Sequence, residues 1–309
     1  MSQSYSIALI QMACSQAPEA NVAKAIARIY HAAEQGATVV CLPELFQTQY
    51  FCQHEDVELF DLAEPVSGPC IESLRQVAKE TGVVLIVPFF EHRAPGLYHN
   101  SVVVLDQAGE RIGLYRKMHI PDDPGYYEKF YFAPGDRGFH VVETSVGKLG
   151  ILICWDQWFP EAARLMTLAG ADILFYPTAI GWHPTEKAEV GHAQQDAWRT
   201  VQRGHAIANG VFVAAVNRVG YEQTSQTDAG IEFWGHSFVC DPFGIMLAEA
   251  SADKEEVLLV EVNRDRIEEV RRHWPFLRDR RIDAYDGILQ RYADHSHPNV
   301  SPAEEKEPQ

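Results

Sequence analysis

Three side chains that could act together in one reaction each stand at the end of a short apolar run. They are the carboxylate of Glu44, the ammonium of Lys117 and the thiol of Cys154. A thiol is mostly protonated at neutral pH, so it needs a base to take its proton or a cation to stabilise the thiolate. Glu44 can supply the base and Lys117 the cation. These residue types predict attack by the Cys154 thiol on a carbonyl carbon.

Such an attack places negative charge on the carbonyl oxygen, which then needs hydrogen-bond donors. The Lys117 ammonium and the backbone N–H of Trp155 are the candidates. Taken singly, a strand-end Glu or Lys is more often a solvated charge, and a buried Cys is more often a small hydrophobe. The coincidence of all three residues at strand ends is what favours catalysis.

The elements that must position these side chains alternate between runs rich in Val, Ile and Leu and helical patterns. Ligand sites of α/β proteins lie beyond the carboxyl ends of strands, so three such ends can converge on one crevice. The pattern predicts an α/β fold of two packed sheets, each covered by helices. The expected strands are 6–12, 38–42, 83–90, 98–105, 112–117, 139–143, 149–154, 173–176, 211–216, 234–240, 245–248 and 257–262, and the expected helices are 21–35, 69–81, 160–169, 190–209 and 263–273.

Composition excludes several classes of protein. The net charge of −17 argues against a nucleic-acid or anionic-membrane partner, because either would require a cationic surface. The 309 residues contain no apolar run long enough to span a bilayer, and the first residues do not resemble a signal peptide. The six cysteines are scattered, without a CxxC pair, which favours a reducing cytoplasm.

The motifs around the three residues resemble those of the nitrilase superfamily of carbon–nitrogen hydrolases. They are Pro43-Glu44, the segment 115–119 (Tyr-Arg-Lys-Met-His) and the segment 150–156 (Gly-Ile-Leu-Ile-Cys-Trp-Asp). The resemblance implies a four-layer αββα sandwich, C–N hydrolysis without a cofactor or metal, and a homo-oligomer that associates through its outer helices. It also implies one hydrolase domain over residues 1–295, followed by a polar tail, 296–309, that is expected to be disordered.

The same resemblance adds a fourth catalytic candidate. Glu128, eleven positions after Lys117, matches the second glutamate of the family, which positions substrate and assists proton transfer.

The segments 119–132 and 202–206 resemble, more narrowly, the branch that hydrolyses N-carbamoylputrescine to putrescine, ammonia and carbon dioxide in polyamine synthesis.

Other functions remain open at the level of sequence. Within the superfamily, the substrate could be a β-ureido acid, an ω-amide or a nitrile. Outside the enzymes, the chain could be a noncatalytic scaffold, although the presence of Glu44, Lys117 and Cys154 together argues against it. No GxSxG, HExxH, Walker A or GxGxxG sequence points to a different chemistry.

Substrate charge separates N-carbamoylputrescine from the β-ureido acids. N-carbamoylputrescine ends in an ammonium, whereas a β-ureido acid ends in a carboxylate. Asp122 and Asp123, which follow Lys117 closely, and Glu186 could give the pocket an anionic lining, with Trp182 as part of its wall. No matching pair of arginines is evident in these segments. The sequence therefore predicts a small cationic carbamoyl amine as the substrate.

Overall fold

The computed structural model describes residues 4–227 and 229–292. The expected tail, 296–309, lies outside the described residues. Two six-stranded sheets form the body of the protein, and a third, three-stranded sheet lies beside them. None of the described helices is both long and apolar enough to cross a membrane.

The first sheet has the strand order β15-β1-β2-β3-β4-β5. Strands β1, β2 and β3 run parallel, and antiparallel neighbours complete both sides. Its strands are β1 (Ser4–Gln11), β2 (Val39–Cys41), β3 (Val84–Ala94), β4 (Leu97–Leu105), β5 (Arg111–Arg116) and β15 (Glu256–Asn263).

The second sheet has the order β14-β13-β10-β8-β7-β6, with β7, β8 and β10 parallel. Its strands are β6 (Val141–Glu143), β7 (Lys148–Ile151), β8 (Ile173–Pro177), β10 (Phe212–Val216), β13 (Phe238–Cys240) and β14 (Met246–Glu249). The third sheet, of order β11-β12-β9, contains β9 (Gly181–Trp182), β11 (Val219–Glu222) and β12 (Ile231–Trp234).

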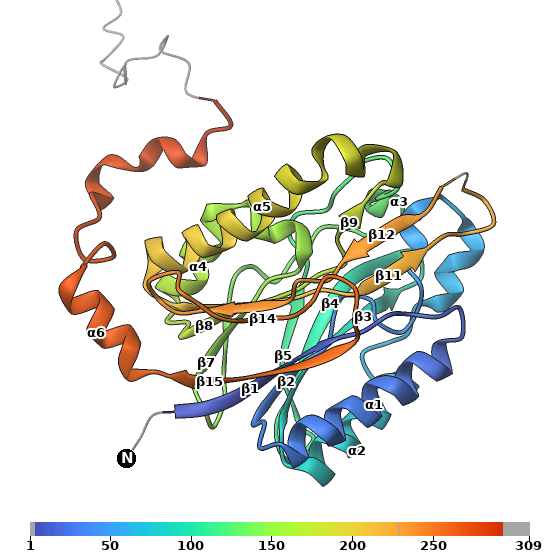
Figure 1. Ribbon diagram of the computed structural model, residues 1–309, viewed down its shortest axis with the longest axis horizontal. Helices are drawn as coiled ribbons and strands as arrows, with labels where there is room; N and C mark the ends of the chain where they lie inside the picture. The colour runs from blue at the N-terminus through green and yellow to red at the C-terminus, as the bar shows by residue number, and fades with distance from the viewer. Residues whose placement is uncertain (1–3, 228, 293–309) are drawn as a thin grey trace, which may run out of the picture.

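Four helices cover the outer faces of the two large sheets (Figure 1). Helices α1 and α2 lie against the first sheet, and α4 and α5 lie against the second. The α-helices are α1 (Pro18–Glu34), α2 (Pro69–Thr81), α3 (Glu128–Tyr131), α4 (Pro160–Leu168), α5 (Pro184–Asn209) and α6 (Asp265–His273). Short 3-10 helices are η1 (Phe51–Gln53), η2 (Val57–Leu62), η3 (Cys154–Trp158), η4 (Ile282–Ala284) and η5 (Asp286–Leu289).

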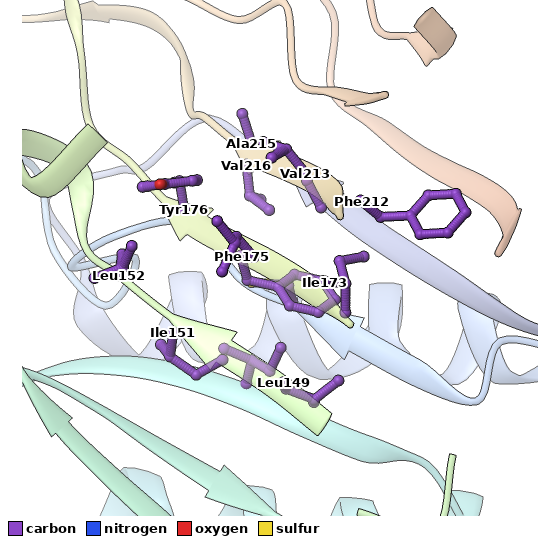
Figure 2. Packing of buried hydrophobic residues seen from close by; sticks show 14 of the residues in the cluster. Leu149, Ile151, Leu152, Ile173, Phe175, Tyr176, Phe212, Val213, Ala215 and Val216 are labelled. Atoms are coloured by element: carbon purple, nitrogen blue, oxygen red, sulfur yellow. The ribbon is translucent and has the colours of Figure 1, made fainter. Parts of the chain in front are cut away.

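Alternation along the strands builds the two sides of each sheet. In β1, Ile7 and Leu9 belong to the core between the sheets, whereas Ala8 and Ile10 pack under α1 and α2. The second sheet contributes buried apolar side chains of β7, β8 and β10, which Figure 2 shows from close by. This packing confirms the expected four-layer αββα sandwich.

The ends of the helices explain two differences from the predicted elements. Helix α2 has the predicted bounds because Pro69 begins it and Gly82, with a φ of 67°, ends it. Helix α1 begins at Pro18 and not at residue 21, because Pro18 occupies its first turn and Asn21 lies buried inside it. Helix α5 also begins at a proline, Pro184, six residues before the predicted start.

The predicted strand 234–240 is wrong. The chain leaves the third sheet after Trp234, turns, and enters the second sheet at Phe238. The turn residues Gly235 and His236 both have positive φ, of 60° and 54°. Two successive residues in this conformation cannot continue a strand, so one predicted strand becomes β12 and β13.

Candidate active site

The structure brings the predicted catalytic residues together where strands of the two large sheets end. Glu44 follows β2 and Lys117 follows β5, both in the first sheet. Cys154 follows β7 of the second sheet and is the first residue of η3. Glu128 begins α3. The cluster thus forms at the ends of two sheets, as the placement of these residues after strands predicted.

Lys117 lies at the centre of the cluster. Its Nζ is 2.7 Å from Glu44 Oε1 and 2.7 Å from Glu128 Oε2, and all three side chains are buried. Burial by itself disfavours the ammonium, but the charges of Glu128 and Glu44 outweigh it and raise the pKa of Lys117 well above its ordinary value. Lys117 therefore stays positively charged at neutral pH.

The Glu44 carboxylate is held by three donors. Lys117 Nζ and Asn100 Nδ2 each lie 2.7 Å from Oε1, and the backbone N–H of Ala179 donates to Oε2 at 2.8 Å. A carboxylate with donors on both oxygens has a fixed orientation. The Ala179 segment also contacts the nucleophile, because Cys154 Sγ lies 3.9 Å from the Ala179 carbonyl oxygen.

Glu128 is held from the other side of Lys117. Its Oε1 accepts a hydrogen bond of 2.7 Å from the Tyr50 hydroxyl, and its Oε2 contacts Lys117. Burial raises the pKa of Glu128; Lys117 opposes this effect and the nearby Glu44 charge adds to it. Glu128 thus gains a proton more readily than an exposed glutamate does.

Cys154 has a backbone φ of 43°, which is rare for a residue with a side chain and marks a sharp turn at the nucleophile. Burial raises the pKa of its thiol well above the ordinary value, and the charge of Glu44 adds to this effect while Lys117 opposes it. The resting group is therefore a thiol. Of the two roles predicted from sequence, removal of its proton by a base is the one that this environment requires.

A buried aspartate fixes the turn that carries Cys154. Asp156 Oδ2 accepts hydrogen bonds from the backbone N–H of Ile153 and from the Tyr115 hydroxyl. Its Oδ1 accepts from the backbone N–H of His119, whose Nδ1 also lies 2.7 Å away. These bonds join the turn after β7 to the segment that follows Lys117.

A cavity of about 610 Å³ opens onto Cys154. Asp123 and Glu186, two of the four candidate binding residues, line it, and so does Trp155, the candidate backbone donor. Its other lining residues are Pro121, Pro124, Tyr126, Trp158, Ala179, Ile180, Gly181, His183, Thr185, Gln194, Ala197 and Trp234. The only charged side chains in this described lining, apart from a histidine, are thus the two carboxylates.

The structure does not place the other two candidate binding residues in the cavity lining. Asp122 is exposed and does not line it. Trp182 is not part of the lining either: its Nε1 donates to the Gly191 carbonyl oxygen at 2.8 Å, and its ring packs against Trp234, which lines the cavity. Trp182 therefore supports the wall and does not form its surface.

Within residues 4–227 and 229–292, no three His, Cys, Asp or Glu side chains are grouped so that they could hold a metal ion.

Sequence reasoning missed two side chains that contact the cluster, Asn100 and Tyr50. Asn100 is a fully buried polar residue in a strand whose next members are Ser101 and then valines. A polar side chain in such a run is a signal that it contacts something specific, because buried polar groups need partners. Tyr50 lies in an irregular segment that carries no such signal.

Known proteins are similar to this chain in sequence and in fold. Residues 6–272 match the model of the carbon-nitrogen hydrolase family. The N-carbamoylputrescine amidase of Solanum tuberosum is 46% identical over 286 residues, which cover 92% of this chain and 94% of that protein. The citrullinase of Francisella tularensis subsp. tularensis (strain SCHU S4 / Schu 4) is 39% identical over 93% of this chain and 98% of that protein.

A solved structure of a carbon-nitrogen hydrolase is also similar to this chain. The crystal structure of a carbon-nitrogen hydrolase from Helicobacter pylori G27 has a TM-score of 0.91 and 48% sequence identity, covering 94% of this chain and 100% of that one. The chain therefore belongs to the carbon–nitrogen hydrolase family and is a hydrolase that acts on C–N bonds.

Proposed function

We propose that the protein hydrolyses N-carbamoylputrescine to putrescine, ammonia and carbon dioxide. The observation that carries this proposal is the cavity over Cys154, whose lining includes Asp123 and Glu186 and, among the described residues, neither lysine nor arginine. Such a lining suits a substrate with a terminal ammonium. The relatives named N-carbamoylputrescine amidase support the same choice.

Cys154, Glu44 and Lys117 carry the first half of the reaction in this proposal. Glu44 takes the thiol proton as Sγ attacks the ureide carbonyl carbon, because the buried thiol does not ionise by itself. The Lys117 ammonium and the backbone N–H of Trp155 stabilise the oxyanion; Trp155 lies in the first turn of η3, where helix N–H groups lack helical partners. Glu44 then returns the proton to the terminal ureide nitrogen, and the C–N bond breaks to release ammonia.

Water completes the cycle. The thiocarbamate left on Cys154 carries the aminobutyl group, and Glu44 takes a proton from the water that attacks its carbonyl carbon. The C–S bond breaks, Sγ recovers its proton, and the released carbamic acid decays to putrescine and carbon dioxide. Glu128 holds Lys117 and assists these proton transfers through the contact at 2.7 Å.

The test is a comparison of three ureides in an ammonia-release assay. We expect kcat/KM for N-carbamoylputrescine to exceed that for 3-ureidopropionate by at least about a hundredfold, because two lining carboxylates together attract a terminal ammonium and repel a terminal carboxylate. L-citrulline, which carries a carboxylate and an ammonium at its far end, should fall between them. Equal rates, or a preference for 3-ureidopropionate or citrulline, would reject this substrate while leaving the thiol mechanism intact.

We further propose that the protein is a cytoplasmic homo-oligomer with a single catalytic domain over residues 1–295. All six cysteines are unpaired and buried, which suits a reducing compartment. Leu165 and Leu168 on α4 are half exposed, and large apolar side chains are exposed along residues 274–292. Light scattering that gives the mass of one chain would contradict the association.

A further inference from the structure

The side-chain amide of Asn100 lies between the two carboxylates of the catalytic cluster. Its Nδ2 is 2.7 Å from Glu44 Oε1 and 3.5 Å from Glu128 Oε2. Lys117 Nζ contacts the same two oxygens, each at 2.7 Å. Two donors, one charged and one neutral, thus face the same pair of acceptors.

Lys117 supplies one positive charge for two buried carboxylates, so this cluster needs further hydrogen-bond donors. Glu44 and Glu128 are both buried, and Lys117 is the ion-pair partner of each in the described part of the chain. A buried carboxylate that lacks donors takes up a proton, because its charged form is poorly solvated. An amide NH2 group has two hydrogens and can donate one to each carboxylate without adding a charge.

The orientation of Asn100 is fixed in favour of this donation. Its backbone carbonyl accepts the Lys117 N–H at 2.9 Å, which sets the two residues side by side on β4 and at the end of β5. Its side-chain Oδ1 is buried without a hydrogen-bond partner among the described residues. An unpartnered buried oxygen destabilises a fold. The side-chain NH2 group therefore contacts the carboxylates at the cost of leaving the side-chain oxygen of the same residue without a partner.

We propose that Asn100 is a positioning residue that stabilises the charged form of this pair of buried carboxylates. It does so by donating to both carboxylates, so that one lysine is sufficient for two buried acids. The proposal rests on the assigned roles of Glu44 and Cys154 but not on the identity of the substrate.

The groups around the cluster make this role measurable. Burial raises the pKa of each thiol and tyrosine that interacts with the cluster. Burial lowers the pKa of Lys117, but the charges of Glu128 and Glu44 outweigh it, so all of these groups already carry their protons at neutral pH. These groups are Lys117, Cys154, Cys52, Tyr50 and Tyr126. Glu128, whose pKa burial raises, remains as a group of the cluster that can gain a proton in acid.

The experiment compares Asn100→Leu and Asn100→Asp with wild type and with Ser101→Ala. Ser101 is the matched control, because it is also buried on β4 but donates to Glu91, outside the cluster. For each protein we measure the pH profile of kcat/KM on N-carbamoylputrescine. We also measure the pH profile of Cys154 alkylation by chloroacetamide, located by mass spectrometry, which needs no turnover.

Loss of the amide should move the acid limb of both profiles to higher pH. Losing a hydrogen bond to a charged group predicts a displacement of about one to two pH units in Asn100→Leu. Asn100→Asp, which adds a third acid, should be displaced at least as far, and Ser101→Ala should not be displaced. The defect of both variants should therefore shrink as the pH rises.

A purely structural role gives a different result. Rates that fall by the same factor at every pH, or acid limbs that coincide with wild type, would overturn the proposal. Asn100→Asp, which keeps the shape of the side chain, carries the test if the leucine variant does not fold. A displaced alkylation profile together with no turnover of N-carbamoylputrescine by wild type would reject the substrate and leave the role of Asn100 standing.

Discussion

Arg218 Nη2 donates a hydrogen bond of 2.7 Å to the backbone carbonyl oxygen of Glu44. It donates a second hydrogen bond, of 2.9 Å, to the backbone carbonyl oxygen of Leu45, a residue whose φ is 50°. That conformation costs a residue other than glycine about 1 kcal/mol or more, so it needs support from its surroundings. Arg218 is fully buried and also pairs with Glu222. The guanidinium thereby stabilises the turn that orients Glu44.

We expect Arg218→Lys to lower kcat at least about tenfold and to change KM much less. A lysine keeps the charge but cannot contact both carbonyls and Glu222 at once, so Glu44 loses its orientation while the cavity lining is unchanged. Steady-state ammonia release and a thermal melt measure the two effects separately. Arg203→Lys is the control, because Arg203 donates to the Gly244 carbonyl away from the site. A folded Arg218→Lys enzyme with normal kcat would disprove this role.

The cavity carboxylates should determine the preference for a cationic substrate. Asp123→Asn and Glu186→Gln should each lower kcat/KM for N-carbamoylputrescine about threefold to tenfold, a modest effect because both side chains are exposed. The same changes should raise kcat/KM for 3-ureidopropionate. Asp122→Asn supplies the control, since Asp122 is exposed but does not line the cavity. An equal effect of all three changes would mean that only the net charge matters.

A thiol reagent should abolish the activity of the enzyme, whereas a chelator should leave that activity unchanged. Alkylation of Cys154 should abolish activity, and substrate should slow that loss by occupying the cavity that opens onto the thiol. Prolonged treatment with a chelator should leave kcat unchanged, because the proposed steps use only side chains and backbone groups of the chain. Activity that vanishes with chelator and returns with a divalent metal would contradict the mechanism.

Strand ends made the centre of the site predictable from the sequence. Glu44, Lys117 and Cys154 could be linked because each follows the carboxyl end of a strand, where the ligand sites of α/β proteins lie, and helix α2 was predictable from its terminal Pro69 and Gly82. The break at His236 was not predictable, because a non-glycine residue with positive φ has no sequence signal of its own.

Contacts between distant segments set the rest of the site. Asp122 and Asp123 are adjacent and chemically identical, yet only Asp123 lines the cavity, because the bend at 123–126 decides which side chain turns inward. The contacts of Asn100 with Glu44 and of Tyr50 with Glu128 span 56 and 78 residues of sequence. Such pairings follow from the assembled sheets and not from any local pattern.

The most direct test of the mechanism is mass spectrometry of the enzyme quenched during turnover of N-carbamoylputrescine. Wild-type protein should carry the aminobutyl thiocarbamate on the peptide that contains Cys154. Cys154→Ser should keep the fold, show no adduct and have no measurable turnover, because a serine hydroxyl is far harder to deprotonate than a thiol beside the same base. An adduct on another residue, or full activity in Cys154→Ser, would contradict the assignment of the nucleophile.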